Sequence, residues 1–259
     1  MQDLNSILAR EIEYHERLYA GFAQKHFARP AVRALRAHMI DRILQVTGTS
    51  RTARVLSLGC GIGDTELLLA PHVTEVVGVD LAPSAIRQAR EDAAQAGRQN
   101  LRYIEGTIES AALEPASFDL IIAIFFLHHL PDAVLAALPR QIHGLLAPGG
   151  CFYSLDPSRH RLSGAIGSLL IPQLMRKYQS PDERQLDATR TAELFTRAGF
   201  TAGTEFYDFV SSPLAGLFPG WRWGYRLARG LDNVMIRVPW LRKLGSNFEV
   251  IARKPRPSS

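Results

Sequence analysis

Short apolar runs alternate with amphipathic segments along most of the chain. From residue 53 onward the pattern predicts strands at 53–58, 75–79, 101–105, 119–124 and 150–155, separated by helices at 63–70, 83–96 and 131–145. A helix at 186–198 and strands at 201–208 and 246–252 follow. This alternation indicates an α/β fold, in which helices cover both faces of a seven-stranded, mostly parallel, doubly wound sheet.

Three further parts of the chain lie outside this core pattern. Residues 1–50 have apolar positions at helical spacing, broken near Pro30, and we assign them to an amino-terminal helical lid on a sheet domain at 51–259. The segments at 157–186 and 209–245 are longer than the connections expected there. Both follow carboxyl ends of strands, where open sheets bind ligands, so we expect a partly helical cap that builds the substrate pocket.

Composition sets limits on the class of protein. The chain has 259 residues, 46% of them hydrophobic, enough for one substantial core. Its 30 basic and 25 acidic residues give a modest excess of +5, spread along the chain, which disfavours nucleic acid as a partner. Two cysteines without a paired motif indicate neither a disulfide framework nor a zinc site. With no export signal and no apolar stretch of about twenty residues, we expect a cytoplasmic protein.

A glycine-rich loop follows the first predicted strand. Gly59, Gly61 and Gly63 alternate there, and glycine alone tolerates positive φ while leaving room for a ligand above the backbone. The second strand ends in Asp80, where a ribose-binding acid falls in nucleotide-binding folds. A dinucleotide fingerprint would need a third glycine where Asp64 stands, which disfavours NAD.

At these residues the chain resembles the class I S-adenosylmethionine-dependent methyltransferases. The resemblance is strong over residues 50 to 156 and looser over the last two strands. The matching motifs are Phe118-Asp119-Leu120-Ile121-Ile122, Leu127-His128-His129-Leu130-Pro131-Asp132, Leu146-Ala147-Pro148-Gly149-Gly150 and Asn247-Phe248-Glu249-Val250-Ile251-Ala252. It implies that S-adenosyl-L-methionine is the cofactor.

The resemblance also implies which residues bind that cofactor. Asp80 would accept from the ribose hydroxyls, and Ser57 and Thr107 depart from acids common in the family, which weakens two expected contacts. No metal ligand cluster is expected. The implied cofactor-binding residues are Gly59, Cys60, Gly61, Gly63, Asp80, Leu81, Thr107, Ile108, Ile124, His129, Tyr14 and Tyr19.

Four residues are candidates for catalysis, because a base helps when the methyl acceptor is a hydroxyl. They are His128, His129, Asp156 and His15, with His160 as a further candidate. Histidine titrates near neutral pH and suits this task. The alternative, which we weight more heavily for the His128-His129 pair, is a structural role at the start of the following helix.

The leading hypothesis is methyl transfer to a small apolar or aromatic metabolite, with oxygen favoured as the acceptor atom. A second hypothesis takes a lipid or quinone from a membrane, because Trp221, Trp223 and Trp240 lie among arginines at 221–243. A third is a regulatory protein that binds S-adenosylmethionine without turnover. A dehydrogenase is the remaining alternative.

Overall fold

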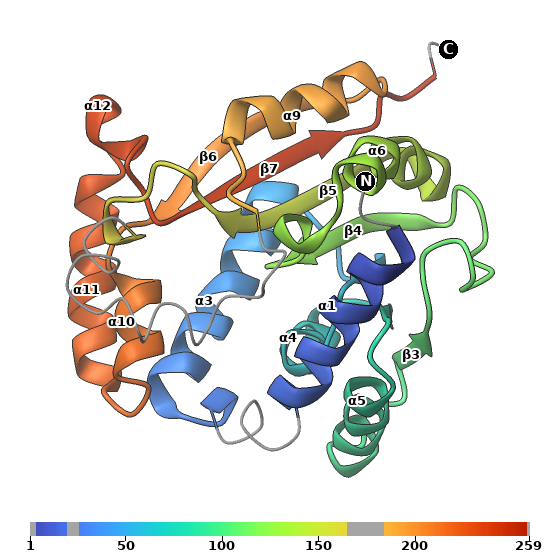
Figure 1. Ribbon diagram of the computed structural model, residues 1–259, viewed down its shortest axis with the longest axis horizontal. Coiled ribbons are helices and arrows are strands. Elements are labelled where there is room, and N and C mark those ends of the chain that lie inside the picture. The colour runs from blue at the N-terminus through green and yellow to red at the C-terminus, as the bar shows by residue number, and fades with distance from the viewer. Residues whose placement is uncertain (1–3, 20–25, 165–183, 258–259) are drawn as a thin grey trace.

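Residues 4–19, 26–164 and 184–257 are described by a computed structural model. Within them, one seven-stranded sheet has the order β3-β2-β1-β4-β5-β7-β6. The first five strands run parallel, and β7 is antiparallel to both neighbours (Figure 1). The strands are β1 (Arg54–Leu58), β2 (Glu75–Asp80), β3 (Leu101–Glu105), β4 (Phe118–Ile124), β5 (Leu146–Pro157), β6 (Thr201–Asp208) and β7 (Asn247–Arg253).

The predicted fold class is therefore confirmed, and the element boundaries agree closely. Strands β3 and β6 have the predicted bounds. Strand β5 is longer than predicted, because Leu146 already pairs with Phe118 and the ladder resumes at Cys151 after an irregularity. Gly149, with φ of +82°, lies in that irregular stretch and permits the turn.

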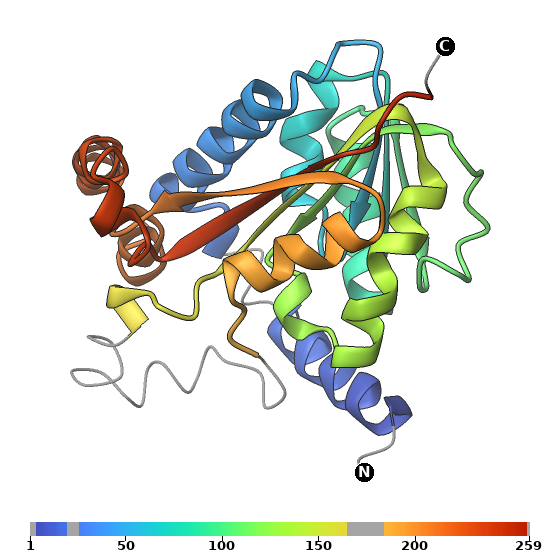
Figure 2. The ribbon, with the colours of Figure 1, turned by 90° about the horizontal axis from the view of Figure 1, so that it is seen from above.

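Helices lie on both faces of the sheet (Figure 2). On one face are α3 (Pro30–Thr47), α4 (Asp64–Leu69) and α5 (Pro83–Gln95), and on the other are α6 (Asp132–Leu145) and α9 (Ala188–Arg197). Short 3-10 turns, η1 (Ala70–His72) and η2 (Leu127–His129), follow α4 and β4. The two faces build separate apolar layers, one centred on α3 and the other on α6 and α9.

Local signals explain where several helices begin and end. Proline opens α3 and α5, at a position where its missing amide costs no hydrogen bond. Gly48 closes α3 in the left-handed conformation and donates its amide to the carbonyl of Leu44. The side chain of Asp187 caps α9 by accepting from the amide of Arg190 at 3.0 Å.

The two described helices of the predicted lid lie in different places. Helix α3 buries Leu35, Met39 and Ile43 against the sheet, so it belongs to the core packing. Helix α1 (Leu4–Tyr19) packs near the start of α5, where Glu16 accepts from the amide of Ser84 at 2.9 Å. The domain boundary at residue 50 stays a prediction.

The second cap segment is helical, as predicted. It folds as α10 (Ser211–Leu217), α11 (Arg222–Met235) and α12 (Pro239–Arg242), between the end of β6 and the start of β7. Much of the first cap segment, residues 165–183, lies outside the described residues. None of the helices in the described ranges is both long enough and apolar enough to span a lipid bilayer.

Two glycines with positive φ, one in the glycine loop and one after α5, test how tightly the fold is packed around them. Gly63 has φ of +75°, and a Cβ there would lie 2.4 Å from the hydroxyl oxygen of Tyr103. Gly97 has φ of +63° with nothing within 4 Å. We predict that Gly97→Ala costs about 1 kcal/mol, from backbone strain alone, and that Gly63→Ala costs about 3 kcal/mol because overpacking is added. Urea unfolding measures both, and equal losses would contradict the packing argument.

Candidate active site

Two adjoining cavities lie at the carboxyl ends of β1, β2 and β4. The first has a volume of about 300 Å³ and is lined by Asp80, Leu81 and the start of α6. The second, of about 310 Å³, is lined by Ser57, Glu66 and part of α10. Both are bounded by the residues that they share: His15, Tyr19, Gly59, Phe125 and His129. The position agrees with the rule that open α/β sheets bind ligands at this edge.

The glycine loop forms the floor between the cavities. Gly59 and Gly61 have φ of +64° and +53°. A Cβ on Gly59 would lie 2.2 Å from the ring of Phe126, and one on Gly61 would lie 2.6 Å from the hydroxyl oxygen of Tyr19. Both glycines are therefore required by close aromatic neighbours as well as by backbone conformation.

Cys60 and Gly63, two other predicted cofactor residues, lie away from the cavities. The side chain of Cys60 is buried beneath Gly78, and Gly63 starts α4. Neither lines the first or the second cavity. Their contribution is to shape the loop from below.

Asp80 connects the ends of β1 and β2. Its Oδ2 accepts from the amide of Gly61 at 2.8 Å, and its Oδ1 accepts from the amide of Ala82 at 2.8 Å. Burial raises the pKa of Asp80, and the two amides partly oppose that rise. Each carboxylate oxygen has a second lone-pair direction, so the group can accept further hydrogen bonds from a ligand in the first cavity.

The predicted residues after β2 and β3 line the same cavity. Leu81, Thr107 and Ile108 bound the first cavity beside Asp80. The amide of Thr107 donates to the Oγ of Ser110 at 2.8 Å, which fixes this short turn. Ile124, at the end of β4, lines the second cavity instead.

Glu66 is a site residue that sequence reasoning missed. It lies on α4, and its Oε1 accepts from the hydroxyl of Ser57 at 2.5 Å. Its Oε2 is buried with no hydrogen-bond partner, and burial raises its pKa to about 7. The available signal was an acid in the first turn of the helix that follows the glycine loop. A carboxylate in this state would be stabilised by a cationic ligand group.

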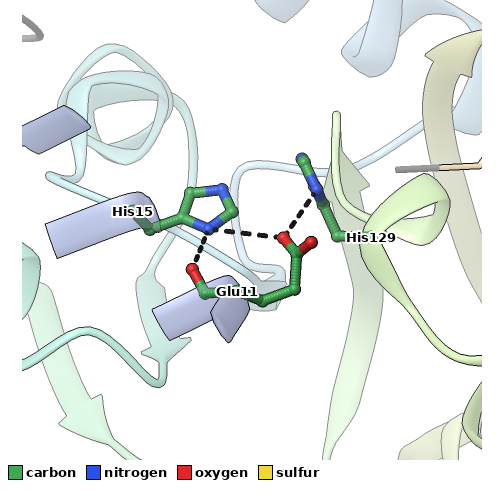
Figure 3. A group of neighbouring side chains, drawn as sticks. All are labelled: Glu11, His15 and His129. Atoms are coloured by element: carbon green, nitrogen blue, oxygen red, sulfur yellow. Dashed lines mark hydrogen bonds and ion pairs between the residues drawn. The ribbon is translucent and has the colours of Figure 1, made fainter. Parts of the chain in front are cut away.

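Helix α1 brings a second missed acid into the site. Glu11, His15 and Tyr19 are spaced four residues apart and share one helix face. The Oε2 of Glu11 lies 3.1 Å from the Nδ1 of His129 and 3.7 Å from the Nδ1 of His15 (Figure 3). The spacing that pointed to His15 and Tyr19 also points to Glu11, one step earlier along the helix.

The protonation of His15 follows from its contacts. Its Nδ1 donates to the backbone carbonyl of Glu11 at 2.8 Å. Burial, and then the neighbouring ring of His129 at 4.7 Å between centroids, lower the pKa of His15. His15 is therefore neutral at neutral pH, and its Nε2 is the ring atom left to accept.

The cluster of Glu11, His15 and His129 also has the donor set of a metal site. One ligand atom from each lies within 4.8 Å of the others. Two imidazoles and a carboxylate suit a divalent transition metal. The predicted absence of a metal stays a prediction, and a chelator test for it is given below.

His128 and Asp156 form a buried pair outside both cavities. The Nδ1 of His128 donates to the Oδ1 of Asp156 at 2.9 Å, and its backbone amide reaches the same oxygen at 3.3 Å. The pair ties the turn after β4 to the end of β5. The ring centroids of His128 and His129 lie 4.0 Å apart, so the fixed ring of His128 also positions His129.

The remaining predicted residues differ in their access to the site. Tyr19 lines both cavities, whereas Tyr14 lines neither. The ring of Tyr14 packs edge-on against that of His15, with 5.3 Å between the ring centroids. His160 is exposed, and its Nε2 lies 3.6 Å from the Oδ2 of Asp187. The structure thus gathers His15 and His129 at the cavities and leaves His128, Asp156 and His160 outside them.

Comparisons with known proteins agree with this geometry. A family model for a methyltransferase domain matches residues 55–150. An uncharacterized methyltransferase of Synechocystis is 31% identical over 57% of this chain and 66% of its own length. A ubiquinone biosynthesis O-methyltransferase of Albidiferax ferrireducens is 36% identical over 46% of this chain and 45% of its own length. The chain thus spans less than two thirds of these curated relatives.

A solved structure shows the same fold over nearly the whole chain. It is a chain from the complex between the Trm112 methyltransferase activator and a putative methyltransferase of Haloferax volcanii. The TM-score is 0.64 at 18% identity, with 93% of this chain and 98% of that chain covered. At this identity the likeness concerns the fold alone.

The buried carboxyl of Glu66 makes stability depend on pH. Its pKa rises from 4.5 to about 7 on folding, so the folded state binds this proton more tightly and loses stability as pH rises between those values. We compare the free energy of unfolding of Glu66→Gln with that of wild type at two pH values. We predict that the variant's value relative to wild type is higher at about pH 8 than at about pH 4.5, by up to about 3 kcal/mol. Thermal unfolding at both pH values measures this, with the exposed Glu91→Gln as control. The same difference at both pH values would contradict it.

Proposed function

Because the chain belongs to the class I S-adenosylmethionine-dependent methyltransferases, we propose that it methylates a small apolar or aromatic acceptor at oxygen. The observation that carries this proposal is the position of His129, a paired imidazole at the boundary of two cavities. A cytoplasmic location is part of the proposal and agrees with two free, buried cysteines.

The residues of the site fit the cofactor of this family. The carboxylate of Asp80 would accept from ribose hydroxyls, and Leu81 and Ile108 offer apolar contact for an adenine ring. The free oxygen of Glu66 would pair with the ammonium of the methionine part. Glu66 would thereby supply the carboxylate that Ser57 lacks. When bound, S-adenosylmethionine supplies an electrophilic methyl group on sulfonium.

The part of the first cavity between α1 and α6 is suited to an apolar acceptor. Its wall above the glycine loop is largely hydrocarbon, and water is displaced when an apolar ring fills such a space. Phe125 and Phe126 follow β4, and further apolar side chains come from α1, from the turn before α6 and from α6 itself: Ile12, Leu130, Val134 and Leu138. A ring held between these side chains would be oriented for in-line displacement.

His129 is placed to act as the base. The Oε2 of Glu11 lies 3.1 Å from its Nδ1, and we assign proton transfer to its other ring nitrogen, Nε2. For a hydroxyl acceptor, the C–O bond would form as the methyl C–S bond of the sulfonium breaks and leaves a neutral thioether, and the hydroxyl proton would pass to that nitrogen. Glu11 would act through His129, because a carboxylate this close to the ring stabilises the imidazolium that forms. The name of the Albidiferax relative supports oxygen as the acceptor atom.

Two alternatives to this proposal remain: one takes its acceptor from a membrane, and the other binds the cofactor without methyl transfer. A lipid or quinone acceptor would use the same base and the same cofactor residues. A regulatory protein would bind the cofactor without transfer, and the paired state of His129 beside an apolar cavity favours catalysis over it. The dehydrogenase hypothesis does not agree with the family of the chain.

Cofactor binding tests the first half of the proposal. Asp80→Asn keeps the size of the side chain but removes its charge, so two charge-assisted hydrogen bonds to the ligand are weakened. We predict that its affinity for S-adenosylhomocysteine falls about a hundredfold in calorimetric titration. Asp41→Asn, on the exposed side of α3, should bind as wild type does. Wild-type affinity in the Asp80 variant would remove Asp80 from the site.

Methyl transfer tests the second half. Release of S-adenosylhomocysteine is measured with a panel of phenols and hydroxyquinones. We predict that His129→Gln lowers kcat about 10²- to 10³-fold while S-adenosylhomocysteine affinity is retained, because only proton transfer is lost. Glu11→Gln should lower kcat about tenfold, and the exposed His160→Gln should leave it unchanged.

The same assay separates a base from a metal site. Activity that survives a chelator supports His129 as the base. Activity that is lost with chelator and restored by a divalent metal ion would assign Glu11, His15 and His129 to a metal instead.

A further inference from the structure

A row of exposed apolar side chains covers the outer side of the helical cap. Helices α10, α11 and α12 form one edge of the molecule (Figures 1 and 2). On α11, Trp223, Leu227, Leu231 and Val234 share one face by their spacing. Two more exposed tryptophans flank this stripe along the chain, Trp221 just before α11 and Trp240 on α12, and we call these six residues together the tryptophan face. Trp223, Leu227 and Trp240 are 71%, 73% and 73% exposed.

The core does not use this face. The opposite side of α11 buries Tyr225, Ala228 and Asp232, and the helix packs against α3 and α10. Soluble proteins show isolated exposed apolar residues, but a contiguous group of this kind marks a surface that another body covers. The tryptophan face is therefore an unpartnered surface in the described part of the chain.

The charge around the face is almost entirely positive. Residues 209–246 contain six basic residues and one acid, which is a local excess of +5. The basic residues are Arg222, Arg226, Arg229, Arg237, Arg242 and Lys243. The one acid, Asp232, is buried and accepts from the amides of Val210 and Ser211, each at 3.0 Å.

We propose that the tryptophan face docks the protein on an anionic lipid bilayer. Tryptophan rings suit the boundary between acyl chains and headgroups, and arginines beside them pair with headgroup phosphates. Arg226 already lies over the ring of Trp223, with Cζ 5.2 Å from the centroid, so one unit presents both an apolar surface and a charge. A second copy of this chain would bring like charges together, which disfavours self-association through this face.

The face also adjoins the site. Ser212 and Gly216 on α10 line the second cavity, and Leu217 and Phe218 at the end of the same helix are exposed. Helix α10 therefore extends from the second cavity to an exposed apolar end beside α11. An acceptor drawn from the membrane would enter beside α10. This consequence rests on the proposed function, whereas docking itself does not.

Vesicle binding tests the proposal without any turnover. All three tryptophans of the chain lie on this face, so intrinsic fluorescence reports on it directly. With vesicles of phosphatidylglycerol and phosphatidylcholine at low salt, the protein should sediment and its emission should shift to shorter wavelength. Phosphatidylcholine alone, or high salt, should weaken binding at least about tenfold. Protein that stays in the supernatant with anionic vesicles overturns the proposal.

Matched variants locate the binding surface. Trp223→Gln with Leu227→Gln, and separately Arg226→Gln with Arg237→Gln, should each weaken partition about tenfold or more. Arg98→Gln with Arg102→Gln removes the same charge from exposed positions near β3 and should change partition less than about twofold. An equal loss of vesicle partition in this control would mean that net charge alone attracts the protein to the bilayer. That result would overturn the assignment of binding to the tryptophan face. A dimer in sedimentation velocity that the Trp223 variant abolishes, without vesicle binding, overturns it as well.

Discussion

The carboxylate of Asp80 is the interaction on which the site depends. By accepting from the amides of Gly61 and Ala82, it ties the turn after β1 to the turn after β2 at the same edge of the sheet. The glycines of the first turn then hold positive φ, and the ring of Phe126 and the hydroxyl of Tyr19 pack directly on them. Without this link, the loop would lose the fixed shape on which α1 and the turn after β4 close.

The sequence predicted the parts of the site that belong to the sheet. The glycine loop and Asp80 follow strands, and strand periodicity with glycine spacing locates both. Glu66 and Glu11 were missed because their roles depend on tertiary contacts. The carboxyl of Glu66 reaches Ser57, where the family commonly has an acid, from the neighbouring helix. Glu11 meets His129 only because α1 is anchored across the cavities by Glu16.

The location of charge on the surface also depends on tertiary structure and does not follow from the sequence alone. The total of +5 is modest, and it indicates nothing about location. Folding buries the single acid of the cap segment and leaves most of its basic residues in water, so the surface is more basic than the segment's composition alone suggests. The same holds for the three tryptophans, because their positions in the sequence do not indicate burial or exposure, and the structure exposes all three.

The two ends of the site are built by different kinds of element. Loops fixed by the sheet form the cofactor end, and the family model matches over this part, residues 55–150. The proposed acceptor end takes Glu11, Ile12 and His15 from α1, all outside the matched range. Elements attached at the edge of a sheet can change without disturbing the strands that hold the cofactor loops. The acceptor can therefore differ among proteins that share this cofactor site, and α1 is the described segment outside the matched range that would determine it here.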